Sequence, residues 1–176
     1  MAEQDTNQGP AATQGRKILA CVDGSENSRI AAAFAARLAR LTGAHLSLLH
    51  VLHTPTFAHW ANIKTQMKRD IREQAEKMVA EIAQGVEESC GIMPEFFIHE
   101  GLPRERIVET VQGDRAIRLV VVGAVGEQGH RRNNVTGSLA RHLGDRLTTD
   151  LACPLLIVPP EMQSEELCAG IEAIAR

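Results

Sequence analysis

The chain has 176 residues, enough for one domain of ordinary size with short tails. Its hydrophobic share of 44% and charged share of 23% are typical of a globular protein, and a formal net charge of -3 argues against general coating of nucleic acid. No apolar run reaches the ~18–20 residues that cross a bilayer, and the polar start lacks an export signal, so we expect a cytoplasmic protein.

The first third of the chain predicts a tail, a strand and a helix. Residues 1–15 mix Gln, Thr, Gly and Pro without periodicity, which is typical of a disordered tail ahead of a domain at 16–160. The apolar run 17–23 indicates a strand buried on both faces. Ser25 is a good N-cap for the helix that follows, and Gly43 supplies the left-handed position that ends it.

The middle of the chain predicts a second strand at 44–52 and a long helix at about 61–90, which Gly91 ends. A short third strand follows at 95–99, and Pro103 suits the start of the next helix. The apolar stripe of the long helix steps by three or four residues. It consists of Ile63, Met67, Ile71, Ala75, Met78, Ile82 and Val86.

The last third predicts a β-branched fourth strand at 119–122, a polar loop at 124–136 and a fifth strand at 154–158. A helix lies between the loop and the fifth strand, because Leu139, Leu143, Leu147 and Leu151 recur at every fourth position. Residues 161–176 are predicted to be a C-terminal tail that could contain a short helix.

Strands that alternate with helices in this way form an α/β fold with a parallel sheet. We therefore expect a Rossmann-like, doubly wound sheet of five strands in the order 3-2-1-4-5, with helices on both faces. The winding direction reverses between strands one and four, and ligands of such sheets bind beyond the carboxyl ends of the strands at that point. Asp23 and the loop Gly123–Gly126 converge there.

The residues at this crevice suit a phosphorylated ligand. Glycines let the backbone approach a phosphate, the helix start near Gly137 and Ser138 adds partial positive charge, and His130, Arg131 and Arg132 bring cations. Asp23 could meet a ribose, a base amino group or a magnesium ion. However, the spacing fits neither the P-loop nor the dinucleotide fingerprint, and a flexible turn with a solvated basic run explains it equally well.

Three stretches of the sequence together resemble the universal stress protein family. They are the opening KILACVDGSENSRIAAAFAARLA, the strand LSLLHVL, and the closing VVVGAVG…TGSLA…CPLLIVPP, which span roughly residues 16–159. The resemblance implies a Rossmann-like fold, usually in a homodimer. One branch of that family binds ATP through Gly-x2-Gly-x9-Gly-[Ser/Thr], and the other branch lacks this pattern and does not bind nucleotide.

The chain is similar to the ATP-binding branch, with one departure. Gly123, Gly126 and the Gly137-Ser138 pair match the pattern, but ten residues rather than nine separate the last two parts, and Ala140 replaces a frequent hydroxyl residue. The resemblance implies ATP as the ligand, and Mg2+ at Asp23 stays one of the options that the carboxylate offers. The crevice chemistry and the resemblance together predict the nucleotide-binding residues Cys21, Val22, Asp23, Val51, Val122, Gly123, Val125, Gly126, Gly129, His130, Arg131, Gly137, Ser138 and Leu139.

Other constellations indicate less. His50 and His53, with His59 further on, would be a poor metal site, because a strand end does not bring such a pair to one face. The four cysteines show no C-x-x-C spacing and are expected to be small buried residues rather than disulfides. No serine or cysteine has an evident base beside it, so no catalytic residue is predicted and at most slow ATP hydrolysis is expected.

The fifth strand predicts an oligomer. In the order 3-2-1-4-5 it is an edge, yet its sequence PLLIV is wholly apolar, and a bare apolar edge invites aggregation. Pairing with a second copy would cover it, as would the tail at 164–175. The expected homodimer interface comprises Pro154, Leu155, Leu156, Ile157 and Val158.

The sequence is compatible with two functions. The first is an adenine-nucleotide-binding module of stress response or signalling, in which ATP shifts the population of two states. The second is a nucleotide-independent dimeric scaffold that regulates a partner protein through its long helix and tail. A phosphate-transfer enzyme is a third reading, which the missing base argues against.

Overall fold

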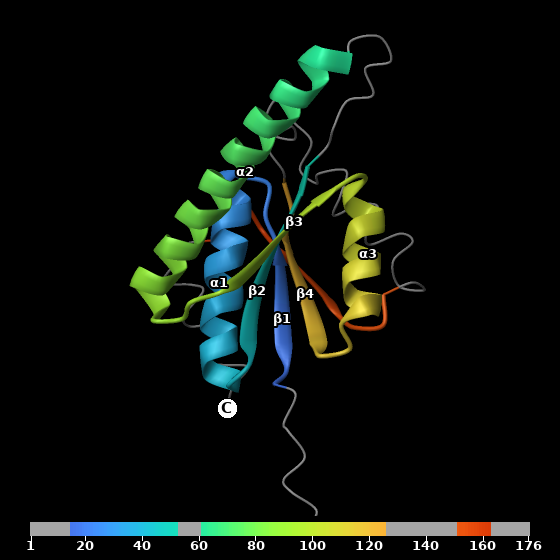
Figure 1. Cartoon of the computed structure of the whole chain (residues 1–176). Coiled ribbons are helices and arrows are strands. Elements are labelled where there is room, and N and C mark those ends of the chain that lie inside the picture. The colour runs from blue at the N-terminus through green and yellow to red at the C-terminus, as the bar shows by residue number, and fades with distance from the viewer. Residues whose placement is uncertain (1–14, 53–60, 126–150, 163–176) are drawn as a thin grey trace, which may run out of the picture.

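The computed structural model of the chain describes residues 15–52, 61–125 and 151–162 (Figure 1). These residues form a parallel five-stranded sheet in the order β3-β2-β1-β4-β5, so the predicted fold class and strand order are confirmed. The elements are β1 (Lys17–Cys21), α1 (Glu26–Thr42), β2 (His45–Leu52), α2 (Ala61–Cys90), β3 (Glu95–Glu100), α3 (Pro103–Gly113), β4 (Ile117–Gly123) and β5 (Leu155–Val158).

The central strand β1 pairs with β2 on one side and with β4 on the other. Ala20, for example, lies opposite Leu48 of β2 and Val121 of β4. Because successive side chains of a strand point to opposite faces, the sheet carries two separate apolar layers. Ile18, Ala20 and Val22 face α1 and α2 in one layer, and Leu19 and Cys21 pack with α3 in the other.

Helix α1 lies close to the sheet because its inward face is built from alanines, which leave little side-chain volume between helix and strands. Ala31, Ala32, Ala35, Ala36 and Ala39 are fully buried there. Both predicted caps are confirmed. Ser25 has extended dihedrals and its side chain accepts a hydrogen bond from the Ser28 nitrogen, and Gly43 ends the helix at a φ of 65°.

Two strand limits differ from the predicted ones by two residues, and four others differ by one. The regular pairing of β1 ends at Cys21 rather than at residue 23, although the Val22 nitrogen still donates to the Leu49 oxygen at 2.9 Å. The chain turns immediately afterwards, because Gly24 adopts a φ of 85°. Strand β4 begins earlier than expected, at Ile117.

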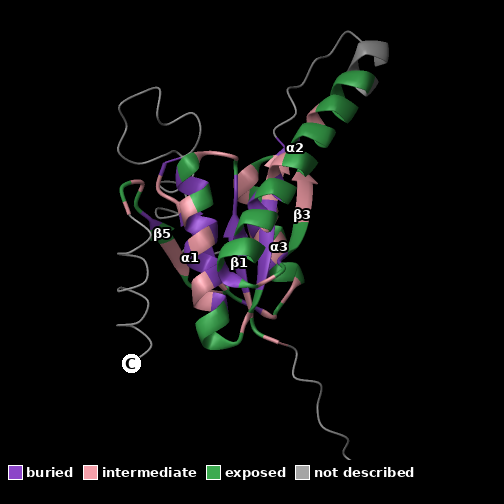
Figure 2. Cartoon of the chain, turned by 90° about the vertical axis from the view of Figure 1, so that its left-hand side faces the viewer, coloured by how far each residue is buried: buried purple, intermediate pink, exposed green. Residues whose placement is uncertain are grey.

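The predicted apolar stripe of α2 is confirmed from Ala75 onward, apart from Met78, and its first member Ile63 has a side chain outside the described residues. From Ala75 onward its inward residues are buried, and Val79 rather than Met78 is the fully buried one. Before Ala75 the helix extends past the sheet, so Met67 is 43% exposed and Ile71 is half-buried. Figure 2 shows this exposed half of α2 standing clear of the body of the molecule. Hydrophobic periodicity defined the face of the helix but not the length of sheet available to cover it.

None of the helices within the described part of the chain is both long and apolar enough to cross a membrane. The helix predicted between the polar loop and the fifth strand falls in 126–150, outside the described residues, as do both predicted tails apart from a few residues at their inner ends.

Candidate functional site

The turn after β1 fixes an exposed carboxylate at the carboxyl edge of the sheet. The Asp23 Oδ1 accepts hydrogen bonds from the Ser25 nitrogen at 3.0 Å and from the Ser25 hydroxyl at 2.6 Å. The Asp23 nitrogen donates to the Ser28 hydroxyl at 3.4 Å, and Ser28 in turn donates to the Ser25 carbonyl. The capping bonds of α1 and the orientation of Asp23 therefore belong to one network.

The chain leaving β4 lies against the start of α1. The Val125 nitrogen donates to the Asn27 Oδ1 at 2.8 Å, and the Ala124 nitrogen donates to the Val158 carbonyl at 2.8 Å. A Cβ on Gly123 would stand 2.9 Å from the Asn27 Oδ1, which is too close for any real side chain. The close approach of Asn27 therefore favours glycine at position 123, independently of any phosphate.

Asn27 is the site residue that sequence reasoning missed. Its side chain is 2% exposed, and its Nδ2 donates to the Val158 and Pro159 carbonyls at 3.2 and 3.1 Å. The available signal was its position, four residues before Ala31 on the buried face of the helix, where a polar side chain needs partners. The sequence could not indicate those partners, because they lie about a hundred residues or more away in the chain.

The other predicted residues near the crevice differ in how far their side chains are accessible to a ligand. Cys21, Val22 and Val122 are buried, so they can offer a ligand little more than backbone groups. Burial raises the pKa of the Cys21 thiol to about 12, with a smaller contribution from Cys153. Val51 is half-buried at the end of β2, two residues beyond the register partner of Cys21.

His50, which the sequence offered as a weak metal ligand, contacts the protein's own backbone. Its Nδ1 lies 2.7 Å from the Val22 carbonyl, so the ring helps to hold the end of β1. His53 and His59 lie outside the described residues. Within the described part of the chain, no group of three or more histidine, cysteine or acidic side chains could hold a metal ion.

A carboxylate and a glycine-containing loop thus meet between β1 and β4, at the point where the winding of the sheet reverses. Residues 15–159 match the model of the universal stress protein family. The chain belongs to this family. It is also 29% identical over 150 residues to the universal stress protein YxiE of Bacillus subtilis, an alignment that covers 81% of this chain and 97% of YxiE.

Solved structures of universal stress proteins share the fold. The protein UspA from Lactobacillus plantarum superposes with a TM-score of 0.69 at 20% identity, covering 81% of this chain and 97% of its own. The Archaeoglobus fulgidus protein in complex with dAMP has a TM-score of 0.56 at 19% identity, covering 82% and 97%. The Arabidopsis thaliana protein with AMP bound has a TM-score of 0.53 at 17% identity, covering 86% and 94%.

All the defined positions after Gly123 in the family's glycine pattern lie outside the described residues of this universal stress protein. This part of the predicted site consists of Gly126, Gly129, His130, Arg131, Gly137, Ser138 and Leu139. The structure places Asp23, Val51 and the Gly123–Val125 segment at the carboxyl ends of neighbouring strands, and the role of every predicted site residue stays a prediction.

Strand β5 forms one edge of the sheet, as predicted. Ile157 is 40% exposed, while Leu155 and Leu156 are half-buried. Val158 is 1% exposed, because its side chain points into the layer beneath α1. The side chain of Val158 therefore cannot take part in the expected dimer interface, and this residue could contribute only its backbone groups.

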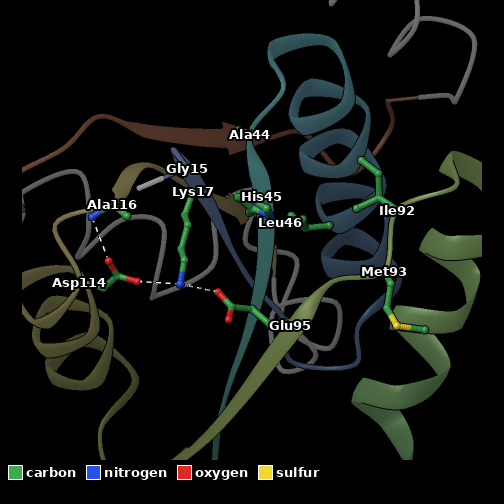
Figure 3. A pocket seen from close by; sticks show the side chains of 10 residues that line it. All are labelled: Gly15, Lys17, Ala44, His45, Leu46, Ile92, Met93, Glu95, Asp114 and Ala116. Atoms are coloured by element: carbon green, nitrogen blue, oxygen red, sulfur yellow. Dashed lines mark hydrogen bonds and ion pairs between the residues drawn. The ribbon is translucent and has the colours of Figure 1, made fainter. Parts of the chain in front are cut away.

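The described residues also line a cavity of about 630 Å³, but it opens at the amino ends of the strands, away from Asp23 (Figure 3). Three charged side chains that line it, Lys17, Glu95 and Asp114, already pair with one another. The Lys17 Nζ lies 2.7 Å from the Glu95 Oε1 and 2.9 Å from the Asp114 Oδ2, and Ser47 donates to Glu95. This mutual satisfaction indicates an ion-pair cluster that stabilises the fold.

The charges of this cluster favour their own ionised forms. Hydrogen bonds to Glu95 and then to Asp114 raise the pKa of Lys17. The hydrogen bond from Lys17 lowers the pKa of Asp114. Burial alone would raise the pKa of Glu95, but the hydrogen bonds from Lys17 and Ser47 outweigh it and leave that pKa below its ordinary value.

Proposed function

We propose that this universal stress protein binds an adenine nucleotide, with ATP as the expected ligand, in the crevice between the ends of β1 and β4. The observation that carries the proposal is the exposed Asp23 carboxylate, held by Ser25, beside the Gly123–Val125 segment. The dAMP and AMP complexes of proteins with the same fold support an adenine ligand.

Each part of the crevice has a role in this proposal. Val51 provides an apolar contact for the adenine at the end of β2, and Asp23 accepts hydrogen bonds from the ribose hydroxyls. Gly126, Gly129 and Gly137 allow the backbone to approach the phosphates, while Ser138 donates its hydroxyl and His130 and Arg131 supply positive charge.

Magnesium enters this proposal together with the nucleotide. The described residues do not form a metal site of their own, so the phosphates would supply most of the oxygen ligands and Asp23 one carboxylate. The protein is proposed to act as a binding module of stress response or signalling, with hydrolysis slow at most.

Calorimetric titration of the full chain, emptied of nucleotide, with MgATP tests the proposal. We expect micromolar binding at one site per chain, and its loss in Gly126→Trp. The matched control is Gly85→Trp, because Gly85 lies on the exposed side of α2 with open space around it. Absence of heat up to millimolar MgATP, or equal binding by both variants, would contradict a nucleotide site at this loop.

We also propose that the protein forms a homodimer through the β5 edge. The exposed Ile157 supports this arrangement, since an apolar edge is normally covered. Sedimentation equilibrium should show a dimer that Ile157→Lys converts to monomer. Leu41→Lys is the control, because Leu41 is 49% exposed at the end of α1 and the change there should leave the dimer intact.

The alternative function is a nucleotide-independent scaffold for a partner protein. The exposed residues 66–70 of α2, among them Met67 with 43% of its surface exposed, are the observation that favours it. A scaffold of this kind predicts a wild-type stress phenotype for Gly126→Trp and a defect for Met67→Glu, whereas the nucleotide module predicts the reverse.

A further inference from the structure

Three hydrogen bonds of Asn27 join the crevice to the β5 edge. The Oδ1 of this side chain accepts from the Val125 nitrogen, and the Nδ2 donates to the carbonyls of Val158 and Pro159. The orientation of the amide is not ambiguous, because only the Oδ1 can accept from an N–H and only the Nδ2 can donate to carbonyls.

The amide is rigid and closely surrounded. Its oxygen and nitrogen belong to one planar group, so a rotation that follows Val125 also moves the donor away from Val158 and Pro159. Asn27 is 2% exposed, and even a Cβ on Gly123 would lie only 2.9 Å from its Oδ1, so water cannot readily replace a lost partner. The Val158 carbonyl additionally accepts from the Ala124 nitrogen, which ties the same two chain segments directly.

We propose that Asn27 is a positioning residue that transmits occupation of the crevice to the β5 edge. This inference rests on the proposed nucleotide site, since the segment that Asn27 holds leads into Gly126. A ligand that orders Val125 strengthens the Asn27 bond to it and, through the shared amide, the bonds to the end of β5. By linkage, a partner or second copy that orders β5 tightens nucleotide binding to the same extent.

Amide hydrogen exchange of the full chain, resolved by NMR, tests without nucleotide whether Asn27 couples Val125 to the end of β5. Asn27→Ala should speed exchange at Val125 and along Leu155–Val158 together, by about tenfold, because each segment loses its buried partner. The matched control is Ser47→Ala, which removes another fully buried polar group far from the crevice. Faster exchange at only one of the two segments would overturn the tie.

A second variant separates positioning from a general loss of stability. Asn27→Asp keeps an oxygen for Val125 but replaces the donor to Val158 and Pro159 with a second acceptor. Exchange should therefore rise along β5 while Val125 stays protected. Equal acceleration at both segments, as for a simple loss of fold stability, would contradict the assigned role.

Saturating MgATP then tests the transmission. In the wild type, nucleotide should slow exchange at Val125 and along β5. In Asn27→Ala, whose affinity we expect to fall about tenfold, nucleotide should protect the loop but leave β5 unchanged. An equal response of β5 in both proteins would overturn the inference. If calorimetry detects no binding by the wild type, the nucleotide proposal fails, and the nucleotide-free comparison still decides whether Asn27 joins the two segments.

Discussion

The hydroxyl of Ser25 lies 2.6 Å from the carboxylate of Asp23 and at the same time accepts from the Ser28 nitrogen at 3.1 Å. The residue that caps α1 is thus also the residue that orients the acidic group of the crevice. Helix stability and the geometry of the proposed binding site share a side chain.

Removal of this hydroxyl should affect both properties. We expect Ser25→Ala to lower the free energy of unfolding by about 1 kcal/mol, the usual cost of a lost N-cap, and to weaken MgATP binding several-fold. Urea denaturation and calorimetry measure the two effects. In Ser89→Ala, which loses a hydroxyl exposed near the end of α2, affinity should be unchanged. Unaltered affinity in Ser25→Ala would show that Asp23 does not depend on Ser25.

Two glycine-to-alanine changes should have opposite signs. Gly123→Ala places a Cβ 2.9 Å from the Asn27 Oδ1 and should destabilise the protein by about 1–3 kcal/mol, as overpacking does. Gly85 lies within α2, and a Cβ added there would meet no other atom within 4 Å. Gly85→Ala should therefore raise the free energy of unfolding by up to about 1 kcal/mol through helix propensity. Thermal or urea unfolding of both variants measures this, and a neutral Gly123→Ala would contradict the close approach of α1 and β4.

The ion-pair cluster of Lys17, Glu95 and Asp114 predicts a defined pH dependence of the free energy of unfolding. The lowered pKa values of Glu95 and Asp114 stabilise the fold above their ordinary values of 4.5 and 3.8, and this contribution is lost as the pH falls through the lowered values. The raised pKa of Lys17 stabilises the fold below 10.5 and is lost as the pH rises through the value in the folded protein.

Lys17→Met should therefore cost about 0.5–1 kcal/mol between roughly pH 5 and pH 10, a modest amount because the cluster is partly exposed. The difference from the wild type should shrink as the pH falls below the ordinary carboxyl pKa values of 4.5 and 3.8, and it should vanish once both carboxylates of the folded protein are protonated. Urea unfolding across pH measures it, with Lys68→Met as a more exposed ion-pair control. A cost that stays constant down to pH 2 would exclude the ion pairs as its cause.

The thiol of Cys21 should be inert in the folded protein. Burial raises its pKa to about 12, so almost no thiolate is present at pH 8, and the side chain is buried beneath α3. Iodoacetamide at pH 8 should leave Cys21 unmodified in native protein and modify it in urea, as peptide mass spectrometry would show. Labelling at similar rates in both states would place the thiol at the surface.

Local patterns sufficed to predict the sheet order and the caps of α1, because these depend on periodicity and on single residues such as Ser25 and Gly43. They did not predict how far α2 would extend past the sheet, since Met67 has the same helical spacing as the buried Ile82. The long-range partners of Asn27 and of Lys17 were also not predictable. Each depends on which strand ends meet in space, and local sequence patterns do not reveal that.

The location of the ligand is the central claim, and the chemical shifts of backbone amides test it most directly. Titration of the isotope-labelled full chain with MgATP should shift the amides of Asp23, Gly24, Val51 and Val125, around the crevice. The amides of Lys17, Glu95 and Asp114, at the opposite edge of the sheet, should stay unchanged. Chemical-shift changes confined to the cavity at the amino ends of the strands, or no changes at millimolar MgATP, would contradict a nucleotide site between β1 and β4.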